Sequence, residues 1–359
     1  MTQSSKDCPP RRLGKMKANL MKLLIAVFAY GLTCLLLDLF VIACFLFGAI
    51  GIFRSICLIY LSNFIVIPAL GAAYSIHKIL GGRDYCVGFG VFAISVCFLL
   101  LFFYSTFIEP RALRIDVVAI PSTKVESELT IAHISDVQSA SVGSYEEKVF
   151  ERLVQLKPDI IFHTGDLVQP HNPENYEREL VKLAQLFKKL NPEYGIYNVP
   201  GNVDRPRMLE VFDEASEVRT IAGRSVTIEG PGWVLDVLGL SFEQSLGGSR
   251  QKIAKWLKGD NNNFKIVLGH APDYVLDIMD SDVDLCLAGH THGGQVNLPF
   301  VGALLNASGT PKEWASGLRR INKMYLNVSS GIGTEHAEGM VPLRFNCRPS
   351  VTVIQVRKE

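Results

Sequence analysis

Three long apolar stretches fill most of the first third of the chain, at residues 23–53, 55–76 and 86–108. A helix needs about 20 apolar residues to cross the hydrocarbon core of a bilayer, and each stretch is longer than that. The first stretch is too long for one upright span, so we expect a tilted or extended helix there. A cleavable signal peptide is not expected, because its apolar core would be much shorter. The sequence therefore predicts about three transmembrane helices in residues 23–108.

Charge separates this apolar part from the rest of the chain. Residues 1–108 carry a net charge of +6, and residues 109–359 carry −5. A basic tail over residues 1–22, together with Lys78 and Arg83 after the second stretch, predicts that both segments face the cytoplasm. Three spans across the inner membrane of the cell would then put residues 109–359 on the opposite face, whereas a stretch lying in the interface would leave them in the cytoplasm. The acidic C-terminal part gives no support to nucleic-acid binding, which normally needs a basic surface.

The sharpest signal in the C-terminal part is the heptapeptide Gly-His-Thr-His-Gly-Gly-Gln at residues 289–295. It follows an apolar, strand-like run at 283–288. His290 and His292 are spaced i, i+2 on a loop that leaves a buried strand, so both imidazoles can reach neighbouring divalent ions. Such a pair on its own is more often structural. Whether it binds metal therefore depends on which other candidate ligands the chain contains.

Further polar residues follow four other strand-like runs, at 129–135, 160–163, 194–199 and 266–269. The residues beyond these runs are, in chain order, Asp136, Asp166, Asn202 with Asp204, and His270. Loops at the carboxyl ends of strands converge on ligands in α/β sheets. Each residue alone could be a turn, cap or core residue, but two carboxylates, one amide and three imidazoles together suit a mixed N/O site for Mn²⁺, Fe or Zn²⁺. His133 and His163 lie inside their runs and are expected to pack near the site.

The order Asp, Gly-Asp, Gly-Asn-x-Asp, Gly-His, Gly-His-x-His resembles the calcineurin-like metallophosphoesterase superfamily over about residues 113–356. The heptapeptide, with Ser-Gly-Ile-Gly at 330–333 and Pro-Leu-Arg-Phe at 342–345, resembles its bacterial membrane-associated branch. This resemblance implies an α/β fold, a four-layer αββα sandwich, with a dinuclear metal centre. We therefore expect a basic tail (1–22), a transmembrane region (23–108) and a metallophosphoesterase domain (109–359), with apolar helical patterns at 145–156 and 175–190 in its outer layers.

The same resemblance implies two metal ions that share one bridging carboxylate. The first ion would bind Asp136 and His292, the second would bind Asn202, His270 and His290, and Asp166 would bridge the two. Asp166, Asn202 and Asp204 would take part in catalysis. The implied chemistry is hydrolytic attack on phosphorus, with the ions neutralising charge on the phosphoryl oxygens.

Two positions depart from the pattern of the superfamily. Gln138 replaces the histidine of the usual Asp-x-His, so it can offer only an amide oxygen or nothing to the first ion, which favours Mn²⁺ over Fe or Zn²⁺. Val203 replaces the histidine of Gly-Asn-His and cannot donate a proton. A phosphate leaving from an anhydride has a second pKa near ~6 and departs unprotonated more easily than an alkoxide.

The Gly-Asn-x-Asp form also resembles the lipid A branch of the superfamily, whose pyrophosphatases split UDP-2,3-diacylglucosamine into UMP and diacylglucosamine 1-phosphate. We therefore expect this hydrolysis, with a lipid-linked phosphate or nucleotide substrate and membrane lipid as partners. The alternatives are a phosphomonoesterase or phosphodiesterase acting on envelope lipids or small phosphoesters, and a non-catalytic metal-binding module.

Two further features have open interpretations. Arg205 and Arg207 flank the Asn202 loop and could bind substrate phosphates or be solvated surface charges. The apolar connection at 298–314 could be a flap for acyl chains or a cover for the core.

Overall fold

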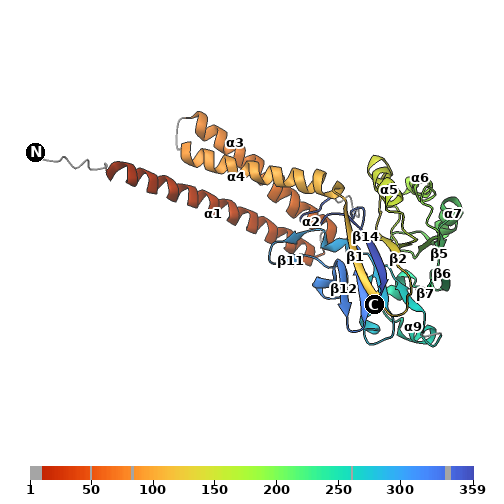
Figure 1. Ribbon diagram of the computed structural model, residues 1–359. Coiled ribbons are helices and arrows are strands. Elements are labelled where there is room, and N and C mark those ends of the chain that lie inside the picture. Colours follow the sequence, from red (N-terminus) through yellow and green to blue (C-terminus); the bar gives the residue numbers. More distant parts are fainter. Residues whose placement is uncertain (1–9, 49–50, 82–84, 260–261, 336–340) are drawn as a thin grey trace, which may run out of the picture. The chain divides into compact units, whose positions relative to one another are not determined.

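The computed structural model describes the chain except for residues 1–9, 49–50, 82–84, 260–261 and 336–340 (Figure 1). Part of the predicted basic tail, and Arg83, therefore lie outside the described residues. The chain divides into two compact units, Met1–Ser105 with Ala337–Val341 and Thr106–His336 with Pro342–Glu359.

The first unit consists of helices. They are α1 (Pro10–Leu46), α2 (Ile52–Leu61), the π-helical turn η1 (Ser62–Val66), α3 (Ile67–Leu80) and α4 (Tyr85–Phe103). Among the described residues, three helical segments are long and apolar enough to cross a membrane, namely Lys17–Leu46, Arg54–Leu80 and Val87–Arg111. The first predicted stretch forms one extended helix that ends at Leu46, and the next helix begins at Ile52 rather than after residue 53.

Asp38 is an acidic residue within the apolar part of α1. Its Oδ1 accepts a hydrogen bond of 2.7 Å from Nδ2 of Asn63, which lies in η1. The same amide also donates to the carbonyl oxygen of Ile59 at 2.9 Å. An acid in an apolar helix is costly unless it has a polar partner, and here a neighbouring helical segment of the same unit provides one.

The second unit contains two six-stranded sheets. The first sheet has the order β1-β14-β2-β3-β4-β5, with β1 (Arg114–Ser122), β14 (Ser350–Lys358), β2 (Leu129–Ile134), β3 (Ile160–His163), β4 (Ile196–Asn198) and β5 (Arg219–Thr220). The second sheet has the order β12-β13-β9-β8-β7-β6, with β12 (Gly317–Ile321), β13 (Met324–Val328), β9 (Leu285–Ala288), β8 (Phe264–Leu268), β7 (Trp233–Gly239) and β6 (Ser225–Gly230).

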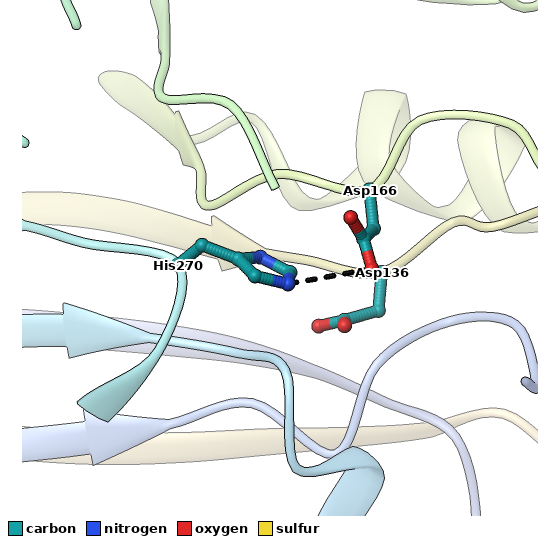
Figure 2. Close-up of side chains that lie close together, drawn as sticks. All are labelled: Asp136, Asp166 and His270. Atoms are coloured by element: carbon teal, nitrogen blue, oxygen red, sulfur yellow. Dashed lines mark ion pairs between the residues drawn. The ribbon is translucent and has the colours of Figure 1, made fainter. Parts of the chain in front are cut away.

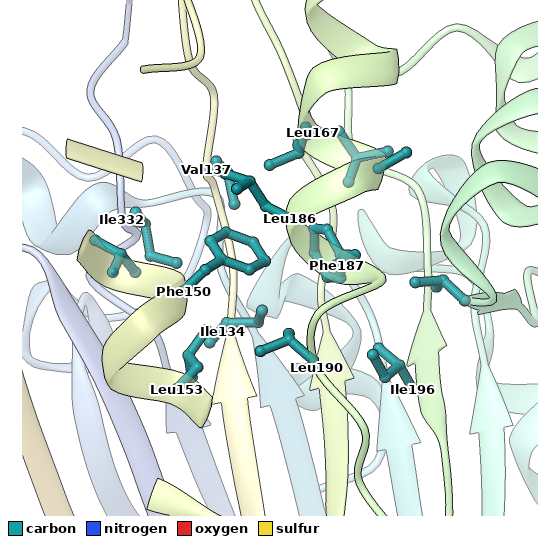
Figure 3. Packing of buried hydrophobic residues seen from close by; sticks show 14 of the residues in the cluster. Ile134, Val137, Phe150, Leu153, Leu167, Leu186, Phe187, Leu190, Ile196 and Ile332 are labelled. Atoms are coloured by element: carbon teal, nitrogen blue, oxygen red, sulfur yellow. The ribbon is translucent and has the colours of Figure 1, made fainter. Parts of the chain in front are cut away.

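Side-chain alternation along the strands builds the layers. In β2, Ile131 joins the core shared by the two sheets, whereas Ala132 and Ile134 join the core under the helices. The helices over the first sheet are α5 (Ser144–Leu156), α6 (Tyr176–Phe187) and α7 (Pro206–Ser216). Figure 3 shows this packing, in which Phe150 of α5 and Phe187 of α6 meet above the sheet with ring centroids 4.9 Å apart.

The second sheet has its own outer layer. Its outward residues pack with α9 (Arg250–Trp256) and the 3-10 segment η5 (Pro272–Asp277). Two sheets that share one core, each covered by helices on its outer face, form the four-layer αββα sandwich that the sequence predicts. The helical patterns predicted at 145–156 and 175–190 correspond to α5 and α6.

Strand direction brings loops of both sheets together. In the first sheet β2, β3 and β4 are parallel, with Ile134 opposite His163 and His163 opposite Asn198. In the second sheet β7, β8 and β9 are parallel. The carboxyl ends of parallel strands lie at one edge of a sheet, so each sheet presents a set of adjacent loops there.

Short elements complete the unit around these loops. They are η2 (Tyr104–Ile108), η3 (Glu109–Arg111), η4 (Pro173–Asn175), α8 (Phe242–Ser245), η6 (His292–Gly294), β10 (Asn297–Leu298), β11 (Gly302–Ala303) and η7 (Lys312–Trp314).

Candidate metal centre

The two carboxylates of the site follow neighbouring strands of the first sheet. Asp136 comes two residues after β2, and Asp166 comes three residues after β3. Their loops are tied together, because the amide of Asp136 donates to the carbonyl oxygen of Gly165 at 2.9 Å. Both aspartates have left-handed backbones, with φ of 48° and 61°. Non-glycine residues are rarely held in this region, and such strain is concentrated at functional sites.

His270 connects these carboxylates to the second sheet, since it follows β8. Its Nε2 lies 3.3 Å from Oδ2 of Asp166 (Figure 2). Potential ligand atoms of Asp136, Asp166 and His270 all lie within 4.8 Å of one another. Three buried donors from two different sheets therefore converge on one point.

The other three predicted ligands join this group. Nε2 of His292 lies 3.5 Å from Oδ1 of Asp136, and Oδ1 of Asn202 lies 3.2 Å from Nε2 of His270. The ring centroids of His290 and His270 are 5.0 Å apart. The structure thus brings together the six residues predicted to bind metal, Asp136, Asp166, Asn202, His270, His290 and His292.

Hydrogen bonding orients His270 for metal binding. Its Nδ1 donates to the carbonyl oxygen of Thr164 at 2.6 Å, which leaves Nε2 to face the oxygens of Asp166 and Asn202. Fixing one ring nitrogen on a backbone carbonyl is the usual way in which a ligating histidine is held. Nitrogen and oxygen acceptors that face one another need a proton or a cation between them.

A buried polar atom supports the same conclusion. Oε1 of Gln138 is buried without a hydrogen-bond partner among the described residues. Buried polar atoms are normally paired, so an orphaned acceptor calls for a ligand. The available donors are carboxylate, amide and imidazole, which fit a divalent ion of the Mn²⁺, Fe or Zn²⁺ type. Gln138 donates from Nε2 to Glu335 at 3.4 Å, and its ligation of metal stays a prediction.

The pKa values of the site residues in the metal-free protein indicate which protons a bound cation would replace. Burial raises the pKa of Asp136 to about 7. Burial also opposes the charge on His270, but Asp166 raises the pKa of this imidazole to about 10. Burial lowers the pKa of His290 to about 4 and holds that of His292 well below its usual value. Near pH 7 and without an ion, His270 therefore retains its proton and Asp136 is partly protonated, and metal binding would displace these protons.

Two glycines allow the loops to approach this closely. A Cβ on Gly201 would lie 2.0 Å from Oδ1 of Asp166, and one on Gly289 would lie 2.3 Å from Oδ2 of Asp136. A side chain at either position would displace a carboxylate. The Gly-Asn and Gly-His pairs of the sequence thus reflect contact of backbone with carboxylates.

Asp204 is hydrogen-bonded to backbone amides beside the site. Its Oδ2 accepts from the amides of Asp166 and Gly201 at 2.9 and 2.8 Å, and its Oδ1 accepts from the amide of Leu167 at 2.8 Å. Both oxygens are thus used to join the loops after β3 and β4. These hydrogen bonds give Asp204 a positioning role in holding Asp166, and its predicted part in catalysis stays a prediction.

Val203 and the two arginines lie beside Asn202. The amide of Val203 donates to Oδ1 of Asp166 at 3.0 Å, and its side chain offers no proton. The guanidinium of Arg205 lies 4.2 Å from the ring centroid of Tyr176, and Arg207 is exposed in the first turn of α7. Phosphate binding by Arg205 and Arg207 stays a prediction.

Several residues that support the site were not identified from the sequence. The ring of Phe242 lies edge-on to both His270 and His290, with centroids 5.8 Å apart in each case. Arg344 is fully buried and donates to the backbone carbonyls of His292 and Ser330, which follow β9 and β13 of the second sheet. The motif at 342–345 pointed to Arg344, but nothing in the sequence singles out Phe242.

The histidines inside the strands have structural partners. His133 is hydrogen-bonded through Nε2 to Thr164 Oγ1 at 3.0 Å and through Nδ1 to the side-chain amide of Asn327 at 2.7 Å. It therefore joins the two sheets below the metal loops. His163 pairs with Oδ1 of Asn198 at 2.7 Å within the first sheet.

The apolar connection at 298–314 divides into two parts. Trp314 packs against the outer core of the second sheet, as a cover would. The preceding hairpin of β10 and β11 exposes Leu298, Phe300, Val301, Leu304 and Leu305. These side chains of the hairpin and of the residues after it therefore do not cover the hydrophobic core.

Known proteins share this sequence pattern. Residues 129–294 match the model of the calcineurin-like phosphoesterase family. The phosphodiesterase YaeI of Escherichia coli (strain K12) is 30% identical over 207 residues, which cover 56% of this chain and 72% of YaeI. The metallophosphoesterase YkuE of Bacillus subtilis (strain 168) is 26% identical over 269 residues, which cover 71% of this chain and 89% of YkuE. These relatives support a hydrolase rather than the non-catalytic alternative.

Proposed function

Because the chain belongs to the calcineurin-like metallophosphoesterase family, we propose that it hydrolyses a phosphoanhydride bond in a lipid-linked substrate at a membrane, with UDP-2,3-diacylglucosamine as the specific candidate. The family and its relatives support metal-dependent hydrolysis at phosphorus. The choice of bond and of substrate rests on the residues of this chain.

The absence of a side-chain proton donor at Val203 carries the proposal. The amide of Val203 is bonded to Asp166, so position 203 is held next to the carboxylate predicted to bridge the ions. An alkoxide leaving from phosphorus gains about 10² to 10⁴ in rate from a positioned acid. A phosphate leaving group has a second pKa near ~6 and departs without one. Phosphoanhydrides are therefore the substrate class whose hydrolysis rate suffers least from the missing acid at position 203.

The remaining residues have roles that follow from their contacts. Divalent ions held by the six ligands would supply an activated water and neutralise charge on the phosphoryl oxygens. Thr164 fixes His270 so that Nε2 faces the centre, and Asp204 fixes Asp166 through its backbone amide. The side-chain oxygen that Gln138 would add favours Mn²⁺.

Membrane-spanning segments support a lipid substrate. Three helical segments of the first unit and its junction with the second have the length and composition of membrane spans. A catalytic unit tethered in this way stays within reach of lipid headgroups, which favours substrates that never leave the bilayer.

Topology favours a second candidate. With three spans and a basic N-terminal tail, the second unit would lie on the face opposite the cytoplasm. A nucleotide-linked lipid would be met on the cytoplasmic face, so this arrangement favours a phosphodiesterase or phosphomonoesterase that acts on envelope lipids. The name of YaeI, a phosphodiesterase, agrees with this candidate.

Product analysis separates the two candidates. The full-length protein, stripped of metal and reloaded with Mn²⁺, would be reconstituted in vesicles with UDP-2,3-diacylglucosamine or with phosphatidylglycerol. Release of UMP that is lost in Asp166→Asn supports the proposal. Cleavage of the phosphodiester without release of UMP supports the second candidate and overturns the first.

A further inference from the structure

The β10–β11 hairpin exposes more apolar surface than a water-facing turn should. Phe300 at its tip is fully exposed, and Val301 and Leu305 are 63% and 51% exposed. Phe300 also has a left-handed backbone with φ of 66°, which is unfavourable for a phenylalanine. A contiguous exposed apolar patch usually marks a surface that contacts a partner or a membrane.

The base of the hairpin is linked to the end of the last membrane span. The amide of Asn297 donates to the carbonyl oxygen of Phe345 at 2.8 Å. Two residues later in the chain, the amide of Cys347 donates to Oε1 of Glu109 at 2.6 Å. Glu109 lies in the span that ends at Arg111. A short segment, 345–347, thus connects the hairpin to the point where the chain leaves the span.

The hairpin is also fastened to the metal loop. A Cβ on Gly294 would lie 2.5 Å from Cβ of Ala303, so β11 packs directly on the loop that carries His292. Sγ of Cys347 donates to the carbonyl oxygen of Gly293 at 3.3 Å. The position of the hairpin is therefore tied to that of the ligands at His290 and His292.

A groove beside the hairpin contains charged residues. It is lined by Lys312, Glu313 and Arg319 together with Leu298 and Phe300, so basic residues outnumber acidic ones there. An apolar edge beside basic residues suits the interface of a bilayer, where acyl chains meet phosphate groups.

We propose that the tip of the β10–β11 hairpin inserts into the bilayer that the N-terminal helices span, and that this contact holds the metal centre at the lipid headgroups. The occupant of the patch is membrane lipid. The inference deepens the proposed function, on which it rests for the lipid nature of the substrate, but insertion itself does not depend on turnover.

Insertion can be measured without any substrate. Phe300→Trp would be made in the full-length protein, with Val154→Trp at an exposed position of α5 as the control. Each variant would be reconstituted in vesicles with or without brominated lipids. Brominated acyl chains quench tryptophan only at short range. We expect the fluorescence added by Phe300→Trp to fall by about half and that added by Val154→Trp to stay unchanged. Equal quenching of the two variants, or none, overturns the proposal.

A second pair of variants tests the effect on turnover. Phe300→Asp with Val301→Asp should raise KM for a lipid phosphodiester in vesicles by about tenfold, while kcat on soluble bis(p-nitrophenyl) phosphate stays unchanged. Val154→Asp serves as the matched control and should change neither value. A loss on both substrates would show a structural role and overturn the proposal. Quenching by brominated lipid without any cleavage of lipid would instead retain insertion and reject the proposed substrate.

Discussion

The two sheets contribute chemically different halves of the predicted metal centre. The first sheet supplies oxygen donors, from Asp136, Asp166 and Asn202. The second sheet supplies nitrogen donors, the histidines at 270, 290 and 292. Neither half alone matches a mixed N/O site, so the centre exists only when the two sheets pack face to face.

The halves also differ in charge. Burial lowers the pKa of His290 and His292, which are therefore neutral ligands near pH 7. On the first sheet burial opposes the charge of Asp166, yet the nearby His270 lowers the pKa of this carboxyl. In the metal-free protein the oxygen half thus carries the negative charge of Asp166, and the nitrogen half carries the positive charge of protonated His270. A cation bound between the sheets would take the place of the proton on His270.

The largest expected effect comes from removing charge on the oxygen half. Asp166→Asn should lower kcat on a soluble phosphodiester by at least about 10³-fold, because one carboxylate serves both predicted ions. Metal analysis should show that the protein binds both ions more weakly. Asp116→Asn, which changes a half-buried carboxylate on β1 that pairs with Arg114, is the control and should retain both activity and metal. Normal metal content in Asp166→Asn would contradict the bridging role.

A change on the nitrogen half should be more selective. His292→Ala removes a ligand next to Asp136 only, so it should cost about one of two ions and lower kcat by about 10²-fold or more. His163→Ala, a buried histidine within β3, should leave the metal content unchanged. Loss of both ions in His292→Ala would show that the two ions do not bind independently of each other.

Substitution of Asp204 tests how the loop that carries Asp166 is held in place. In Asp204→Asn one of the side-chain acceptors becomes a donor that faces backbone amides, so Asp166 should shift and activity should fall by about 10- to 100-fold. Because the ligands themselves remain, a higher Mn²⁺ concentration should restore part of the rate. An Asp204→Asn enzyme that binds metal normally but shows no turnover at any Mn²⁺ concentration would support the predicted catalytic role of Asp204.

Charge balance predicts a pH dependence of stability. The pKa of His270 is raised from 6.5 to about 10, so the folded metal-free unit holds a proton that the unfolded chain has released. The free energy of unfolding should therefore decrease from pH 7 to 8.5, by about 1 kcal/mol for each pH unit. An ion takes the place of the proton, so stabilisation by Mn²⁺ should increase over the same range. Thermal unfolding with and without Mn²⁺ at both pH values measures this, and a constant difference would contradict it.

The smallest expected effect concerns the leaving group. Val203→His should leave the rate on a phosphoanhydride unchanged and raise the rate on an unactivated alkyl phosphodiester by about tenfold, because only an alkoxide needs a proton. Val203→Leu is the control for side-chain bulk. A large gain on the phosphoanhydride would show that its leaving group does need an acid.

The sequence was most informative where a ligand follows a buried strand. The strands before Asp136, Asp166 and His270 begin and end within two residues of their predicted bounds, because apolar runs define them locally. The pairing of β14 with β1 and β2 could not be predicted, since it joins residues more than 200 positions apart.

Supporting contacts were the least predictable part of the site. The role of Asp204 depends on amides from two different loops, and the link from Glu109 to Cys347 spans most of the chain. Residue type and spacing carry no information about such contacts. They become visible only when the packing of the two sheets is known.

The central claim is that two divalent ions lie between the sheets. Anomalous diffraction from crystals of the protein loaded with Mn²⁺ tests it most directly. We predict two peaks about 4 Å apart, one beside Asp136 and His292 and the other beside Asn202, His270 and His290, with Asp166 between them. A single peak, or peaks that contact residues of only one sheet, would contradict the account.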